Sequence, residues 1–322
     1  RSWWGFETLP EVEEEDPSYG NFVCGKGGVI DTWLGLGASG FRLDVADELP
    51  DDFIEKIRAA VKAHGEDKLL IGEVWEDATT KEAFDHRRTY LRGHGLDATM
   101  NYPFRNAAVA FARGEDASAV GEQIMSICEN YPKPALDCAM NFLSTHDTER
   151  GITAIAGEPA NGRDRYWQSK RMIPGDRIDD ALRRVLLAYA MLYTLPGVPC
   201  VYYGDEIGMG DDLDLEERYA VRTPMQWAGS QGGGFSAADP EKFIAPIIDR
   251  GPYRYQKINV ADSLLHRNSL LHRIIDIANT RSEFPEIAVA PFRLLTIDSD
   301  AVLGIYYETE ERSILTFVNF SD

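Results

Sequence analysis

Short apolar runs alternate along this chain with longer stretches in which apolar residues recur every three or four positions. Apolar runs that end in polar or acidic residues predict buried β-strands. They cover residues 41–45, 69–74, 96–102, 139–143 and 199–203. Stretches with helical periodicity cover residues 29–36, 53–65, 107–130 and 178–194. Strands that alternate with helices predict right-handed βαβ units and a parallel sheet.

The pattern changes after residue 204. Residues 210–256 are rich in Gly, Asp and Pro, which predicts loops, and helical periodicity returns over 263–282. After Pro291, apolar and polar positions alternate over 302–307 and 313–319. That period of two predicts antiparallel strands.

Two domains are therefore expected. Residues 1–290 would form an α/β domain, and residues 291–322 would begin a small antiparallel β domain. Near the start of the chain, the acidic segment 8–21 carries Pro10 and Pro17 and is expected to be a surface loop.

Composition narrows the range of partners. The net charge of −20 argues against nucleic acid or an anionic membrane as a partner, and it is compatible with a neutral ligand such as a sugar. No apolar run approaches the length of a membrane helix. The four widely spaced cysteines predict reduced thiols, with a disulfide as the alternative. A cytoplasmic location is favoured, and secretion is the alternative because a signal peptide could have preceded Arg1.

Three of the predicted strands end in a carboxylate, namely Asp44, Glu73 and Asp147. Carboxylates at the C-terminal ends of successive parallel strands converge on one mouth of a barrel. A pair of carboxylates at such a mouth is typical of glycoside hydrolysis. The three together predict a catalytic site.

The neighbours of each carboxylate suggest separate roles. Strand alternation places Arg42 on the side of Asp44, where it keeps the carboxylate ionised, as a nucleophile requires. Glu73 lies near Trp75, and a carboxyl beside a dry aromatic wall can serve as a general acid.

The third motif could bind a sugar and stabilise the transition state of its cleavage. His146 beside Asp147 provides an imidazole and a carboxylate for sugar hydroxyls and for an oxocarbenium-like transition state.

Each motif taken alone has a simpler interpretation. Carboxylates at strand ends often cap helices or form turns, and this is the expectation for Asp47 and Glu48, which lead into Pro50. The His146–Asp147 pair could be a local hydrogen bond, and Trp75 could belong to the core. Their occurrence as a set, in this order, favours a site.

The runs 40–44, 72–73 and 144–147 resemble, in the same order, three signature motifs of the α-amylase family, glycoside hydrolase family 13. Residues 9–12 resemble a further, weaker motif of that family. The family fold is a (β/α)₈ TIM barrel followed by an antiparallel β-sandwich. The resemblance implies that this chain supplies about strands 4 to 8 of the barrel and the start of the second domain.

The resemblance also implies roles for individual residues. Asp44 would be the nucleophile of a retaining mechanism, Glu73 the general acid/base and Asp147 the stabiliser of the transition state. The substrate-binding residues would be Arg42, His146 and Arg150.

Two departures from the family pattern stand out. Thr145 occupies a position where the family usually has Asn, which would alter sugar contacts without removing catalysis. The first three barrel strands are not found, so another segment or another chain would supply them, or the chain is a truncated piece. Some relatives carry calcium, but no Asp-rich loop of ligand spacing occurs here, so no cofactor is expected.

Two parts of the chain resemble different members of the family. Residues 3–203 are most similar to neopullulanases and cyclomaltodextrinases, notably over 44–50 and 100–104. From residue 204 onward, 208–210, 222–227 and 234–236 resemble trehalose synthases and oligosaccharide α-glucosidases; 222–227 could equally be a packed loop that only shapes the pocket.

The expected function is a retaining glycosidase that cleaves maltooligosaccharides, starch or pullulan. The alternatives are a trehalose synthase-type transglycosylase acting on maltose and an inactive carbohydrate-binding fragment.

Overall fold

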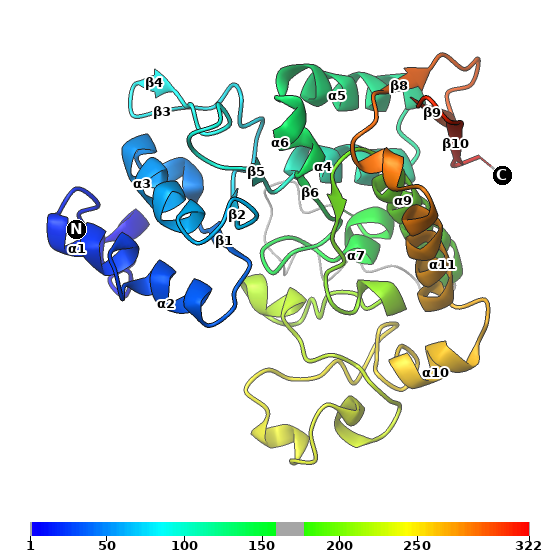
Figure 1. The fold of residues 1–322 in the computed structure, drawn as a ribbon. Helices are drawn as coiled ribbons and strands as arrows, with labels where there is room; N and C mark the ends of the chain where they lie inside the picture. Colours follow the sequence, from blue (N-terminus) through cyan, green and yellow to red (C-terminus); the bar gives the residue numbers. More distant parts are fainter. Residues whose placement is uncertain (1, 159–176, 322) are drawn as a thin grey trace. The chain divides into compact units, whose positions relative to one another are not determined.

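The computed structural model describes residues 2–158 and 177–321, and Figure 1 traces the chain through them. The chain forms two compact units. The first unit comprises residues 1–102 and 127–140, and the second comprises residues 103–126 and 141–322. The chain thus leaves the first unit once and returns to it before entering the second for good.

The first unit is built on a parallel sheet of three strands, in the order β1 (Gly40–Leu43), β2 (Leu69–Gly72) and β5 (Ala98–Thr99). Helix α3 (Asp51–Lys62) connects β1 to β2. Its apolar residues recur at helical spacing and are buried: Phe53, Ile54, Ile57 and Val61. The parallel pairing and the connecting helix confirm the predicted βαβ unit.

Shorter elements complete the first unit. The helices are α2 (Val29–Gly35) and α6 (Lys133–Asp137), and β3 (Glu82–Ala83) pairs with β4 (His86–Arg87) as an antiparallel hairpin. Met140, in β6 (Met140–Asn141), forms an isolated parallel bridge with Met100.

Helix α1 (Pro17–Cys24) corrects the predicted loop over residues 8–21. Asp16 caps this helix, because its carboxylate accepts a hydrogen bond of 2.8 Å from the backbone N–H of Ser18. Pro17 occupies the first helical position, where a missing N–H has no cost. The proline that suggested a loop therefore starts a helix.

In the second unit, α9 (Ile178–Thr194) has the bounds that the periodicity predicts, and it packs against α7 (Gly151–Ala156) and α11 (Leu270–Glu283). Two predicted helices are divided in the structure. Residues 107–130 fall into α4 (Tyr102–Ala112) and α5 (Ala117–Asn130).

The break between these two helices lies at Gly114, whose φ of +95° belongs to the left-handed region that ends helices. Residues 263–282 likewise span α11 and part of α10 (Val260–Leu265). Ser269 caps the second of these helices, because its hydroxyl accepts a hydrogen bond from the backbone N–H of His272.

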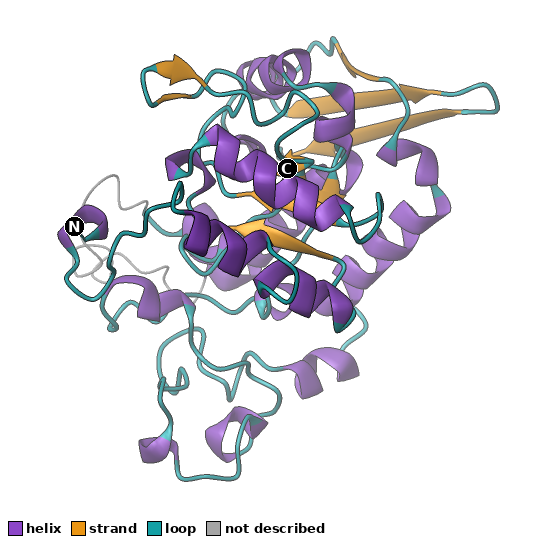
Figure 2. Cartoon of the chain, turned by 60° about the vertical axis from the view of Figure 1, so that its left-hand side comes forward, coloured by secondary structure: helices purple, strands orange, loops and turns teal. Residues whose placement is uncertain are grey.

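The last strands form an antiparallel sheet in the order β10 (Ser313–Asn319), β9 (Val302–Glu308) and β8 (Phe292–Leu295). In Figure 2, β9 and β10 are the long paired strands. Side chains along β10 alternate, with Ile314 and Val318 buried and Leu315 and Phe317 exposed. This confirms the predicted period of two, while the domain boundary near residue 290 stays a prediction.

A further short pair in the second unit joins β6 to β7 (Val198–Pro199), where the carbonyl of Asn141 accepts a hydrogen bond of 2.7 Å from the N–H of Cys200. All four cysteines are free thiols. Cys138 and Cys200 are partly buried. Among residues 2–158 and 177–321, no helix combines the length and apolar character needed to cross a membrane.

Candidate active site

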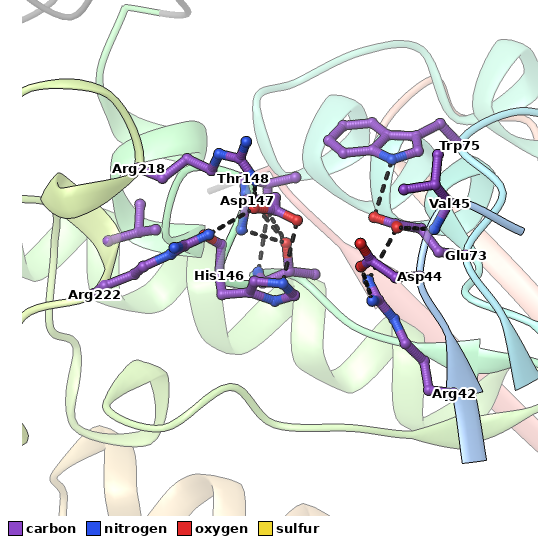
Figure 3. A network of polar contacts seen from close by, with 12 residues as sticks. Arg42, Asp44, Val45, Glu73, Trp75, His146, Asp147, Thr148, Arg218 and Arg222 are labelled. Carbon is purple, nitrogen blue, oxygen red and sulfur yellow. Dashed lines mark hydrogen bonds and ion pairs between the residues drawn. The ribbon is translucent and has the colours of Figure 1, made fainter. Parts of the chain in front are cut away.

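Asp44 and Glu73 directly follow two paired strands of the first unit. The last residues of these strands, Leu43 and Gly72, are partners in the parallel register of β1 and β2. One guanidinium contacts both carboxylates: Nη1 of Arg42 binds Oδ1 of Asp44, and Nη2 lies 3.1 Å from Oε2 of Glu73. Figure 3 shows Arg42 reaching both acids. The predicted contact between Arg42 and Asp44 is confirmed.

The two carboxylates differ sharply in exposure. The side chain of Asp44 is 73% exposed, whereas that of Glu73 is 5% exposed. Solvent or a ligand can therefore approach Asp44 directly. Glu73 is instead enclosed by groups of the protein that fix its orientation.

Four groups surround the carboxylate of Glu73. Besides Arg42, the backbone N–H of Val45 donates to Oε2 at 2.9 Å, Nε1 of Trp75 donates to Oε1 at 3.2 Å, and the hydroxyl of Tyr102 lies 3.5 Å from Oε1. Val45 has a φ of +46°, in the left-handed region, which is uncommon for a β-branched residue. Strained backbone of this kind occurs often at functional sites.

Trp75 is not a core residue. The residue is 45% exposed, and its ring stacks on Tyr102, with ring centroids 4.3 Å apart and planes 15° apart. The apolar wall expected beside Glu73 is therefore present, and Tyr102 is a part of it that sequence reasoning did not assign to the site.

Asp147 lies in the second unit, where two arginines and a histidine surround its carboxylate. Oδ1 accepts hydrogen bonds from Arg218 at 2.8 Å and from Arg222 at 2.9 Å, and Oδ2 lies 3.2 Å from Nε2 of His146. Arg222 also donates through Nε to the carbonyl of His146 at 2.8 Å. Figure 3 shows both arginines pointing at Asp147.

Opposing effects act on the pKa of Asp147. Burial alone would raise it, but the hydrogen bond from Arg218 and the charges of His146, Arg218 and Arg222 together hold the pKa below its ordinary value. Asp147 is therefore kept ionised well into the acidic range.

Thr145 folds inward. Its hydroxyl accepts hydrogen bonds of 3.1 Å from the backbone N–H groups of Asp147 and Thr148, and the residue is buried. This local pattern is typical of a hydroxyl-capped turn. Thr145 thus shapes the loop that carries Asp147, which corrects the expectation that it alters sugar contacts.

Arg150 corrects a second expectation, because its side chain is fully buried. The guanidinium donates to the carbonyls of Tyr203 at 2.6 Å and Val221 at 3.2 Å, and it lies 3.4 Å from Oδ1 of Asp205. A buried guanidinium engaged in this way has no surface to offer a sugar. Arg150 is a structural residue, and its assignment to substrate binding was wrong.

The buried acid beside Arg150 is itself well satisfied. Asp205 accepts hydrogen bonds from the hydroxyls of Ser144 and Tyr189, the second at 2.9 Å. Burial raises the pKa of Asp205, although Arg150, Ser144 and Tyr189 each act to lower it. Ser144 precedes the Thr145–Asp147 loop, so this network anchors one end of that loop.

Sequence reasoning missed the two arginines that bind Asp147. Arg222 opens the 222–227 motif, which drew attention to it without indicating its partner. Arg218 offers no local signal, since it lies 71 positions from Asp147 in the chain. In the part of the chain that the structure describes, no three His, Cys, Asp or Glu side chains gather as metal ligands would.

Comparison with known proteins agrees with this picture. The family model described as "Alpha amylase, catalytic domain" matches residues 5–289. A cyclomaltodextrinase of Geobacillus thermopakistaniensis (strain MAS1) is 36% identical over 205 residues, covering 63% of this chain and 27% of that protein. A trehalose synthase of Thermus thermophilus is 31% identical over 322 residues, covering 90% of this chain and 32% of that protein.

A solved structure has a fold similar to that of this chain. The crystal structure of alpha-amylase from H. orenii is similar with a TM-score of 0.74 and 22% identity, covering 98% of this chain and 57% of that one. The chain spans less than a third of the length of the two curated relatives above. It belongs to the α-amylase family, whose TIM-barrel glycosidases with a C-terminal domain are its structural neighbours.

Proposed function

We propose that the protein is a retaining glycoside hydrolase that cleaves α-glucosidic bonds in maltooligosaccharides, starch or pullulan. The observation that carries this proposal is the guanidinium of Arg42 in contact with both Asp44 and Glu73. In retaining enzymes the two carboxyl groups lie about 5–5.5 Å apart. A single guanidinium that touches both carboxylates is compatible with such a spacing.

In the first step, the exposed carboxylate of Asp44 attacks the anomeric carbon of the sugar. Glu73 gives its proton to the glycosidic oxygen, the carbon–oxygen bond breaks, and the leaving sugar departs with that proton. A glycosyl ester of Asp44 remains. The contact with Arg42 orients the carboxylate of Asp44 before attack.

In the second step, water replaces the leaving sugar. Glu73, now a carboxylate, takes a proton from the water, whose oxygen attacks the anomeric carbon and frees Asp44. The tight enclosure of Glu73 by Val45, Trp75 and Tyr102 supports this double role, because a fixed carboxyl can serve both steps without reorganisation. The chemistry uses these side chains and water and needs no cofactor.

Asp147 would stabilise the positive charge that builds on the sugar ring. Its lowered pKa supports this role, because a carboxylate must stay ionised to stabilise a cation. His146, whose side chain is 46% exposed, would bind sugar hydroxyls.

A second candidate is a transglycosylase that isomerises maltose to trehalose. The similarity to the trehalose synthase of Thermus thermophilus, over 90% of this chain, favours it. Both candidates share the first step and differ in whether water or a sugar hydroxyl accepts the glycosyl group.

One set of incubations separates these candidates. The protein is mixed with maltoheptaose, pullulan or maltose, and the products are followed by chromatography and by proton NMR in the first minutes. We expect shorter α-glucans with newly formed α-anomers. Initial β-anomers would contradict a retaining mechanism, trehalose from maltose would favour the second candidate, and no product from any α-glucan would overturn both.

A further inference from the structure

Residues 2–10 of the first unit form a closed loop. Ser2 and Pro10 make an antiparallel bridge, the N–H of Trp3 donates to the carbonyl of Leu9 at 2.8 Å, and the N–H of Leu9 donates to the carbonyl of Phe6 at 2.9 Å. A loop tied in this way holds its side chains in fixed directions.

This loop carries a stack of three aromatic rings, here called the aromatic platform: Trp3, Trp4 and Phe6. The centroids of Trp3 and Trp4 are 5.3 Å apart with planes at 23°, and those of Trp3 and Phe6 are 6.2 Å apart with planes at 26°. Trp4 is 75% exposed and Phe6 is 55% exposed. These stacked rings therefore present apolar surface to solvent.

The carboxylate of Glu48 holds the two tryptophans of the platform in place. Its Oε2 accepts a hydrogen bond from Nε1 of Trp3, and its Oε1 accepts one of 2.8 Å from Nε1 of Trp4. Trp4 also holds a φ of +50°, a strained conformation for a large side chain. With both indole N–H groups satisfied, only the ring faces remain available to a ligand.

Glu48 connects the platform to the candidate catalytic pair, because it lies close to Asp44 in the chain. Glu48 ends the short 3₁₀ helix Ala46–Glu48, which follows β1, and it lies four positions after Asp44. The sequence had suggested a turn former at Glu48. In the structure, both oxygens of its carboxylate instead accept hydrogen bonds from tryptophan rings.

The chemistry around the platform selects a neutral ligand. The same segment exposes Glu7, Glu11, Glu13 and Glu15, which would repel an anion and can accept hydrogen bonds from hydroxyl groups. The electron-rich face of an aromatic ring attracts the weakly positive hydrogens of C–H bonds. A sugar ring offers both, with C–H groups on its face and hydroxyls at its edge.

We propose that the aromatic platform binds glucosyl units of an α-glucan chain beyond the bond that is cleaved. This inference rests on the proposed function for the identity of the ligand. The loop also exposes Leu9 and Val12, so a second copy of the chain is the competing occupant. Three rings are small beside the roughly 800 Å² per partner of a standard protein interface, which favours the sugar.

The test uses binding, so that it does not depend on turnover. In an Asp44→Asn background, the chain is titrated with maltoheptaose by calorimetry. We expect Trp4→Ala to raise the Kd roughly three- to tenfold, Phe6→Ala to raise it less, and Trp4→Phe to stay near the parent value. The matched control is Trp33→Ala, since Trp33 is 57% exposed on α2, outside the platform, and its loss should change the Kd less than about twofold.

Several outcomes would overturn the proposal. They are an unchanged Kd in both Trp4→Ala and Phe6→Ala, an equal loss in Trp33→Ala, no binding of maltoheptaose by the parent, or a shift from dimer to monomer in light scattering when Trp4 is replaced. Circular dichroism checks that each variant is folded, and Phe6→Ala provides the answer if Trp4→Ala does not fold.

Hydrolysis and binding are measured separately, so the proposed function and the platform can fail independently. If the chain with Asp44 intact hydrolyses no α-glucan but binding still depends on Trp4, the platform stands and the proposed hydrolysis fails. If hydrolysis proceeds and Trp4→Ala leaves the KM for maltoheptaose unchanged, the platform fails and the hydrolase stands.

Discussion

Arg42 in the first unit and Arg150 in the second both lie within three positions of a carboxylate that ends a predicted strand, yet the structure gives them opposite settings. Arg42 reaches a highly exposed carboxylate, Asp44, and contacts Glu73 with the same guanidinium. Arg150 has no exposed side-chain area and pairs with Asp205, whose side chain is 1% exposed.

The difference shows that an arginine near a carboxylate can belong either to an exposed site or to a buried ion pair. An exposed pair leaves its acid open to a ligand and contributes little to stability. A buried pair contributes to the fold, because removing one partner leaves an uncompensated charge in the interior. Four substitutions test this contrast between an arginine that serves chemistry and one that serves the fold.

The largest effect is expected for Asp44→Asn. Loss of a nucleophile should lower kcat by at least about 10⁴-fold, because the covalent route is removed. Stability should barely change, since the side chain of Asp44 is mostly exposed. Initial rates on maltoheptaose and urea denaturation measure the two effects, and Asp52→Asn, an exposed acid of α3, is the matched control. Near-parent activity in Asp44→Asn would remove Asp44 from the mechanism.

Arg150→Met should instead reduce stability, by about 3–5 kcal/mol, because Asp205 loses its buried counter-charge. The folded-state pKa of Asp205 is already raised above its ordinary value of 3.8, and the substitution raises it further. A carboxyl whose pKa is raised on folding makes the folded state less stable as pH rises. The loss of unfolding free energy in Arg150→Met should therefore be larger at pH 7 than at pH 5. Urea denaturation at both values measures it.

The control for this experiment is Arg183→Met, which replaces an exposed arginine of α9. Its free energy of unfolding should stay within about 0.5 kcal/mol of the parent. Equal stability of the two variants would show that the buried pair does not hold the second unit together.

Arg42→Lys should have a smaller effect, and on activity. Lysine keeps the charge but lacks the planar fork that reaches two carboxylates at once. A small misplacement of the two carboxylates should lower kcat/KM roughly 10- to 100-fold. The free energy of unfolding should change by less than about 1 kcal/mol. A stability loss as large as that of Arg150→Met would erase the contrast between the two arginines.

The smallest effect is expected for Arg218→Met, which removes one of the cations at Asp147. The lowered pKa of Asp147 means that its contribution to stability is present above about pH 3.8 and is lost as pH falls through the folded-state pKa. The variant should therefore lose at most about 1 kcal/mol near neutrality, because Arg218 is largely exposed, and the loss should fade in acid.

For the same reason, the acid limb of the pH–activity profile should move to higher pH in Arg218→Met, since a weaker field lets Asp147 take up a proton sooner. Denaturation from pH 3 to 7 and rates over the same range check both expectations. A shift to lower pH would show that Arg218 does not stabilise the ionised form.

Several elements could be predicted because their signals are local. The helix Ile178–Thr194 follows from its own periodicity, and the strands Val302–Glu308 and Ser313–Asn319 follow from alternation. The contact between Arg42 and Asp44 follows from two positions along one strand. Local failures also have local causes, as at Gly114, where a left-handed residue divides one amphipathic stretch into two helices.

The amino-acid sequence by itself therefore determined which residue types stand at the strand ends and which neighbours they have within a few positions. Only the tertiary structure decided that Arg150 is buried, that Tyr102 and Val45 enclose Glu73, and that Glu48 holds two tryptophans. The separations involved are 28 and 29 positions at Glu73 and 44 and 45 at Glu48. Contacts across such distances depend on how whole elements pack, because packing, and not spacing along the chain, brings their side chains together.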